Sequence, residues 1–179
     1  HTISPVKNEA GEIIGASGII RDITERKQAE ETRARLAAIV ETSNDAIISR
    51  SLDDKILSWN AAAERLFGYT ANEAIGQRIS MIFPPDRAEE IARNRALLAQ
   101  GKAILDLETE RLAKDGRRID VSLSQSPIRD NSGATAGAAL VFRDIRERKR
   151  AQEAQAHLAA IVENAHDAII GRALDGTIT

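Results

Sequence analysis

The stretch Trp59-Asn60-Ala61-Ala62-Ala63-Glu64-Arg65-Leu66-Phe67-Gly68-Tyr69 decides how the middle of this chain folds. Asn60 is a preferred N-cap residue, and Gly68 is of the type that commonly follows the last turn of a helix, so a short helix is predicted between them. Two strand-like segments, 46–51 and 55–59, precede it and are separated by turn residues. The central region therefore begins with a hairpin that leads into a short capped helix.

Further elements follow, each separated by turn residues. Thr70-Ala71-Asn72-Glu73 has the spacing of a capping box and predicts another short helix. Pro84-Pro85-Asp86 predicts the start of a longer helix that ends at Gly101. Three strands are then expected, over 104–112, 118–128 and 134–145. Because the turns between them are short and contain glycine, the order predicts an α+β unit with one antiparallel sheet.

Alternation of apolar and polar residues assigns the strand faces. In the strand 104–112 the pattern places Leu105, Leu107 and Thr109 on one face. In the strand 134–145 apolar residues occupy both faces, so we expect this strand to be central in the sheet, with helices over one face.

The sequence also repeats itself. Ser4–Ile56 returns without a gap as Ser126–Ile178, and Arg21-Asp22-Ile23 returns as Arg143-Asp144-Ile145. A long period of mixed composition indicates an array of domains. The repeat divides the chain into 1–23, the last strands of a truncated unit; 24–44, a helical linker; 45–145, one complete unit; 146–166, a second helical linker; and 167–179, the first strands of a further unit.

Both linkers are expected to be amphipathic helices. Leu36 and Ile39 lie in the 3-4 spacing of a coiled coil, and Leu158 and Ile161 occupy the same places in the second copy. We therefore expect a homodimer through the linker helices. The alternative, equally favoured by the sequence, is that each helix packs on its own domain.

Composition narrows the class of protein. A net charge of −2 argues against nucleic acid as a partner, and the absence of cysteine removes disulfides and thiolate metal sites. No apolar run reaches the roughly 18 residues that span a bilayer, and no signal peptide is visible. We expect this part of the protein to lie in the cytoplasm, and a membrane attachment elsewhere in the parent protein is compatible with that location.

Several motifs, taken together, resemble the PAS (S-box) sensor family. They are Asp45-Ala46-Ile47-Ile48, the stretch 59–69, Glu73-Ala74-Ile75-Gly76, Lys114-Asp115-Gly116 and the closing Arg143-Asp144-Ile145 before a charged helix. The resemblance implies a PAS fold: a five-stranded antiparallel sheet with its first and last strands adjacent at the centre, short helices on one face around a small cavity, and helical coiled-coil linkers. The segment 13–22 is short, apolar and rich in isoleucine, which predicts a buried strand. The sheet order of the family implies that this strand pairs with 167–172 of a neighbouring chain.

The resemblance further implies a function. The chain would be a sensory, signal-relay and dimerisation module of a multi-PAS signalling protein, passing conformational change to an output domain, most often that of a sensor histidine kinase. The alternatives are an unliganded spacer and the PAS region of a cyclic-di-GMP cyclase or phosphodiesterase. No nucleophile arrangement or phosphate-binding glycine loop is present, so the fragment itself is not expected to be an enzyme.

The expected ligand cavity is small and mostly apolar, and an ordinary core is its alternative interpretation. Its expected lining is Leu57, Phe67, Ile82, Ile91, Leu107, Val121, Leu123, Gln125 and Phe142. No cofactor or metal is predicted: the helix from Asp86 to Gln100 has no histidine for haem, and covalent flavin photochemistry is excluded without a cysteine. An unidentified small ligand remains open, with Gln125 as its polar contact.

The expected relay lies where the last strand becomes the exit helix. In the family this junction carries an Asp-x-Thr pattern, which Asp22-Ile23-Thr24 fits, whereas Asp144-Ile145-Arg146 has lost the threonine. Asp144 would pair with Arg143 or Arg146, and a plain N-cap is the alternative role. The carboxylate pairs Asp53-Asp54 and Glu89-Glu90 are expected to be solvated, and His157 and His166 to be surface or cap residues.

Overall fold

The computed structural model describes residues 2–7, 9–19 and 22–164. The chain divides into two compact units, of which the first ends at Glu41 and the second begins at Thr42.

The first unit is a hairpin followed by a helix. Strand β1 (Thr2–Lys7) pairs antiparallel with β2 (Ile13–Ile19), and α1 spans Thr24–Glu41. The start of the strand expected to be buried is exposed: Ile13 is 69% and Ile14 is 64% exposed. Within the described residues, only β1 pairs with this strand. The expected partner segment 167–172 lies outside the described residues.

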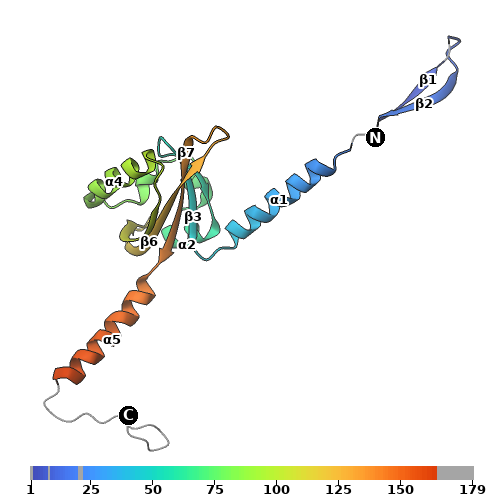
Figure 1. Ribbon diagram of the computed structural model, residues 1–179. Coiled ribbons are helices and arrows are strands. Elements are labelled where there is room, and N and C mark those ends of the chain that lie inside the picture. The colour runs from blue at the N-terminus through green and yellow to red at the C-terminus, as the bar shows by residue number, and fades with distance from the viewer. Residues whose placement is uncertain (1, 8, 20–21, 165–179) are drawn as a thin grey trace, which may run out of the picture. The chain divides into compact units, whose positions relative to one another are not determined.

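The second unit contains one five-stranded antiparallel sheet in the order β4-β3-β7-β6-β5 (Figure 1). Its strands are β3 (Ala46–Ser51), β4 (Ile56–Trp59), β5 (Ile104–Leu112), β6 (Arg118–Arg129) and β7 (Thr135–Asp144). The expected sheet is confirmed, with the first strand and the apolar last strand, β3 and β7, adjacent at its centre. Antiparallel pairing of β7 with β6 continues the meander that the short turns predict.

The hairpin β1–β2 reproduces the register of β6–β7. Thr2 faces Ile19 as Ser124 faces Val141, which are the matching residues in the sequence repeat. Even the irregularity before Lys7 recurs before Arg129. The two copies of the repeat thus form the same local structure.

Short helices cover one face of the sheet. They are α2 (Ala61–Phe67), α3 (Ala71–Ala74), the 3-10 turns η1 (Ile79–Ile82) and η2 (Pro85–Arg87), and α4 (Ala88–Ala99). Asn60 Oδ1 accepts from Ala63 N at 3.0 Å and from Ile47 N at 2.9 Å, so the N-cap of α2 also binds the central strand. The helix expected from Pro84 instead begins with the turn η2, and only from Ala88 is it an α-helix.

The core lies between these helices and the sheet. Phe67 is at its centre, with its ring centroid 5.5 Å from that of Trp59 and 5.4 Å from that of Phe142 in an edge-to-face arrangement. Such pairs stabilise a core beyond the area that they bury.

The face assignment of Leu105 is wrong. A register irregularity lies between Ile104 and Leu107, and Asp106 adopts a φ of 50°. The irregularity reverses the alternation locally, so Leu105 is 73% exposed while Leu107 packs against the core.

Candidate functional site

The helix α4 presents a mostly polar face to the sheet. Its buried residues are Glu90, Asn94 and Leu98, each four positions after the previous one. Two of the three carry hydrogen-bonding groups, which must find partners when they are removed from water. The interior between α4 and the sheet is therefore built around polar contacts.

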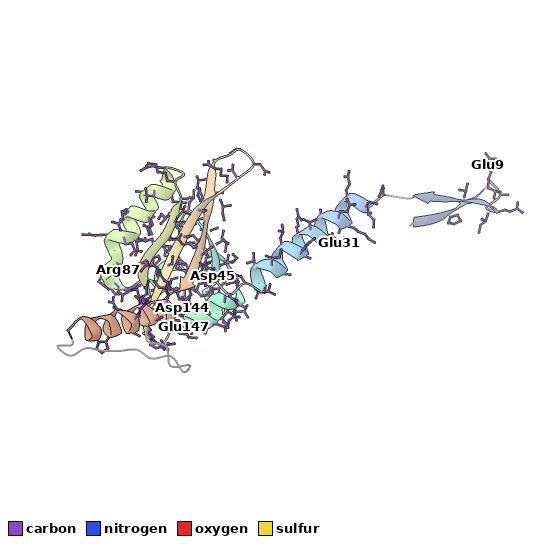
Figure 2. All side chains as sticks on the ribbon, turned by 60° about the horizontal axis from the view of Figure 1, so that its bottom comes forward. Glu9, Glu31, Asp45, Arg87, Asp144 and Glu147 are labelled. Atoms are coloured by element: carbon purple, nitrogen blue, oxygen red, sulfur yellow. The ribbon has the colours of Figure 1, made fainter. Side chains whose placement is uncertain are left out.

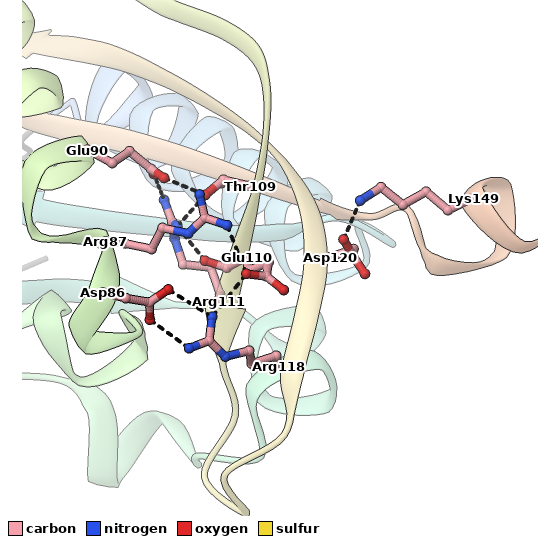
Figure 3. A network of polar contacts seen from close by, with 9 residues as sticks. All are labelled: Asp86, Arg87, Glu90, Thr109, Glu110, Arg111, Arg118, Asp120 and Lys149. Carbon is pink, nitrogen blue, oxygen red and sulfur yellow. Dashed lines mark hydrogen bonds and ion pairs between the residues drawn. The ribbon is translucent and has the colours of Figure 1, made fainter.

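The first of these contacts is a buried ion pair. Arg111 of β5 is fully buried and donates from Nη2 to Glu90 Oε1 at 2.7 Å and from Nη1 to Thr109 Oγ1 at 3.0 Å (Figure 3). The hydroxyl of Thr109 donates in turn to Glu90 Oε2 at 2.5 Å. The guanidinium lies 4.3 Å from the ring centroid of Phe83, in cation–π geometry. Burial lowers the pKa of Arg111, and the bond to Glu90 opposes that shift.

A second polar cluster lies at the other end of the same helix face. Asp54 accepts hydrogen bonds from Arg50 of β3 and from Arg95 of α4. Arg50 also donates to Gln125 Oε1 at 3.3 Å, and Gln125 Nε2 donates to the carbonyl of Asn94 at 3.2 Å. Burial, followed by repulsion from Arg95, lowers the pKa of Arg50. These bonds attach α4 directly to the turn between β3 and β4 and to β6, and Asp54 and Gln125 connect it in turn to Arg50 of β3.

The polar clusters leave little space inside the domain. The cavity next to Gln125 and Leu140 has a volume of about 20 Å³. That is room for about one water molecule. In this conformation the interior is filled by the chain's own side chains.

The expected lining residues divide into two groups. Phe67, Ile82, Val121, Leu123 and Phe142 are buried in the core, and Leu107 packs against them. Ile91, Leu123 and Gln125 border the small cavity.

Leu57 does not join them. Its side chain is 57% exposed, because Ile56 and Trp59 take the buried positions of β4. Ile56, which is fully buried, replaces Leu57 in the core.

Sequence reasoning missed the buried charges. Asp54 and Glu90 were expected to be solvated, and both are buried, whereas their neighbours Asp53 and Glu89 are exposed. A signal was available: Arg111 alternates with Thr109 on the inward face of β5, and Glu90 is eight residues before Leu98, on the same helix face. A charged residue at a position whose spacing places it on the buried face of a helix or strand predicts a buried partner of opposite charge.

The junction between β7 and the exit helix α5 (Arg146–Asn164) forms the second candidate region. Asp144 Oδ1 accepts from Arg146 N at 3.0 Å, and the Arg146 guanidinium binds the same carboxylate. The side-chain bond from Arg146 is the main reason why the pKa of Asp144 is lowered. Arg143 instead forms a two-pronged pair with Asp45, 2.8 Å from Nη2 to Oδ2. Figure 2 shows Asp45 and Asp144 at the same end of the sheet.

Two further ion pairs attach the first turn of α5 to the sheet. Lys149 Nζ binds Asp120 of β6, which raises the pKa of Lys149 (Figure 3). Arg148 Nη2 donates to Glu108 of β5 at 2.5 Å. Ile145, just before the helix, is buried and donates its backbone N–H to the carbonyl of Asp120 at 3.1 Å.

The other expected site residues lie on the linkers. Asp22 Oδ1 accepts from Thr24 N at 2.8 Å as expected of a cap, and bonds from Thr24 lower the pKa of Asp22. Leu36 and Ile39 of α1 are exposed. The side chains of Leu158 and Ile161 lie outside the described residues, as does His166, whereas His157 is exposed on α5.

The described ranges contain neither a cluster of metal ligands nor a helix that could span a membrane. No three His, Cys, Asp or Glu side chains there gather closely enough to hold a metal ion. None of the helices described has the length and apolar character needed to cross a membrane.

Comparison with known proteins places this geometry in a family. A family model for the PAS fold matches residues 34–145, and one for a PAS domain matches residues 1–25. The signal transduction histidine-protein kinase AtoS of Escherichia coli is 31% identical over 126 residues, which cover 70% of this chain and 20% of that protein. Sensor protein FixL of Bradyrhizobium diazoefficiens is 42% identical over 88 residues, covering 46% of this chain and 17% of that protein.

A third relative has a different output. The Escherichia coli protein named "Probable diguanylate cyclase DgcE" is 24% identical over 151 residues, or 81% of this chain and 14% of that protein. The chain thus spans a fifth or less of the length of these three relatives.

A solved structure agrees with the family models. The PAS domain of a protein from Colwellia psychrerythraea superposes with a TM-score of 0.59 at 30% identity, covering 65% of this chain and 98% of that one. The match of the PAS-fold model to well over half of the residues, together with the five-stranded sheet and its short helices, shows that this chain belongs to the PAS family.

Proposed function

We propose that the chain is a signal-relay and dimerisation module of a multi-domain sensor protein, and that the β7–α5 junction transmits movement of the sheet to the exit helix. The observation that carries this proposal is the attachment of the first turn of α5 to two strands, through Lys149 to Asp120 and through Arg148 to Glu108. Because both contacts are charged and lie within one helical turn, a shift of β5 against β6 alters the direction of the helix.

The parent protein is proposed to be a sensor histidine kinase in the cytoplasm, with a cyclic-di-GMP enzyme as the alternative output. Relatives of both kinds support this range. A tandem arrangement of PAS units is also proposed. The match of residues 1–25 to a PAS domain and the register shared by β1–β2 and β6–β7 support it.

A second candidate function is an unliganded spacer that sets the distance between neighbouring domains. The observation in its favour is the filled interior, with a cavity of about 20 Å³. A spacer would hold its output domain in place without responding to the ion pairs of the junction.

A charge exchange in the full-length parent protein separates the two. Asp120→Lys and Lys149→Asp each place like charges together, and the double variant restores an opposite pair. For a relay, each single variant changes the ratio of stimulated to basal output, and the double variant recovers it; Asp144→Ala also changes it. Lys102→Asp, an exposed charge change on the loop after α4, is the matched control. Unchanged regulation in both single variants would favour the spacer.

A further inference from the structure

A groove runs along the C-terminal half of α4, outside the small interior cavity. Its volume is about 660 Å³, within the range of small-molecule sites. Leu52, Ala96, Leu98 and Ala99 form an apolar wall, and Arg50 and Arg95 form the charged end.

The charged end carries more positive than negative charge. Arg50 and Arg95 share a single carboxylate, that of Asp54, which reaches them from the interior side. One positive charge is therefore left over. Burial is the main cause of the lowered pKa of Arg50, and repulsion from the guanidinium of Arg95 lowers it further. An anion at this end would relieve that repulsion.

Arg95 is placed to receive such an anion. Its side chain is 52% exposed, and its bond to Asp54 uses only the Nη2 atom of a guanidinium that has five N–H donors. A guanidinium edge matches a planar carboxylate, which it can bind through two parallel hydrogen bonds. The adjoining leucine and alanine side chains offer no polar partner. They therefore favour a ligand whose carboxylate is attached to a hydrocarbon chain.

We propose that this groove binds a small amphipathic monocarboxylate, with its carboxylate on Arg95 beside Arg50 and its hydrocarbon chain along Leu52 and Leu98. The single excess charge favours a monoanion over a phosphate dianion. The groove borders β3, which pairs with the central strand β7, so binding adds an input to the proposed relay. Binding is measured on the 179-residue chain alone, so its failure leaves the relay proposal standing, and the converse also holds.

Calorimetric titration with sodium octanoate tests the proposal. We expect saturable binding of one octanoate per chain, with octan-1-ol, acetate and inorganic phosphate each binding at least about tenfold more weakly, because each lacks either the planar monoanion or the chain. Arg95→Gln should weaken octanoate binding by about tenfold or more, the effect of losing a charge-assisted hydrogen bond. Arg93→Gln, an exposed charge on the same helix that does not line the groove, is the matched control and should leave the affinity unchanged.

Leu52→Glu gives a second test that does not depend on the ion cluster. Leu52 is an exposed residue on the apolar wall, so the substitution leaves the core intact while it repels a carboxylate, and binding should be lost. The proposal is overturned if octanoate shows no saturation, if octan-1-ol, acetate or phosphate binds equally well, or if either groove variant binds like the wild type.

Discussion

Arg111 shows how a single residue can determine the character of a core. Its guanidinium is fully buried, and Glu90, Thr109 and Phe83 surround it. Removing one member of a buried pair leaves an uncompensated charge, whereas replacing both members with apolar residues costs little. The main effect of the Arg111–Glu90 pair is therefore to restrict which residues can occupy the space between α4 and the sheet. Its net contribution to the free energy of unfolding is small.

Substitutions at this pair should be strongly non-additive. Glu90→Leu leaves the Arg111 charge without its carboxylate and is expected to lower the free energy of unfolding by about 3 kcal/mol or more. The triple variant Glu90→Leu, Thr109→Val, Arg111→Met removes the three side chains whose polar groups bind one another and should recover most of that loss. Urea denaturation measures both, and equal destabilisation of the two variants would contradict the account.

Asp144 should give the junction a defined acid dependence. Its pKa is lowered in the folded state, chiefly by Arg146, so the stabilisation is complete above the ordinary aspartate range and is lost as the pH falls through the lowered pKa. The difference in unfolding free energy between wild type and Asp144→Asn should be constant at neutral pH and shrink below about pH 4. Denaturation curves at pH 7 and pH 3 check this; a difference that grows in acid would refute it.

Among the elements, α4 is held in an unusual way. Its attachments are Glu90 to Arg111, Asp54 to Arg95 and the carbonyl of Asn94 to Gln125, and only Leu98 among its buried residues is apolar. Helices of globular domains are usually stabilised by an apolar stripe. By contrast, α2 buries Ala62, Ala63 and Phe67 against the sheet.

This difference predicts that α4 opens more readily than the rest of the unit. Amide hydrogen exchange in α4 should be faster than in β7, which is central and paired on both sides. Added salt should increase exchange in α4 selectively, because the half-exposed Arg95 contact is screened. Exchange followed by mass spectrometry at two salt concentrations measures this, and protection of α4 equal to that of β7 would contradict it.

At the scale of the whole molecule, the helix α1 carries the surface through which a homodimer is proposed. The helix α1 has no buried residue, and it exposes Leu36, Ile39 and Val40 on its last turns. Exposed apolar residues at coiled-coil spacing indicate a partner surface, and a second copy of the chain is the proposed partner.

Charges in that seam should therefore dissociate a dimer. The double variant Leu36→Glu, Ile39→Glu is expected to shift the chain to a monomer, because four carboxylates would face one another in the paired helices. Arg35→Glu, next to the seam, is the control and should keep the wild-type mass. Sedimentation equilibrium gives the mass directly; identical behaviour of wild type and double variant would rule out this interface.

The sequence alone determined the elements, because caps and turns act within a few residues. The predicted local geometry is found at Asn60, at Gly68 and in the Thr70–Glu73 capping box. The apolar composition of 134–145 correctly predicted that β7 is the central strand. The family and the fold followed from the same motifs. These predictions depend on interactions between residues that are close in the chain or alternate along one strand.

Only the tertiary structure decided what fills the interior. Glu90, which binds Arg111, and Asn94, whose carbonyl binds Gln125, both belong to α4. The irregularity that exposes Leu105 lies in the pairing of β5 with β6. The burial of Asp54 and Glu90 likewise depends on Arg95 and Arg111, which are distant from them in the sequence. From the sequence alone, a charged side chain is predicted to lie at the surface, because burying a charge costs free energy. Only groups that folding brings together offset that cost, so the tertiary structure decides whether the charge is buried.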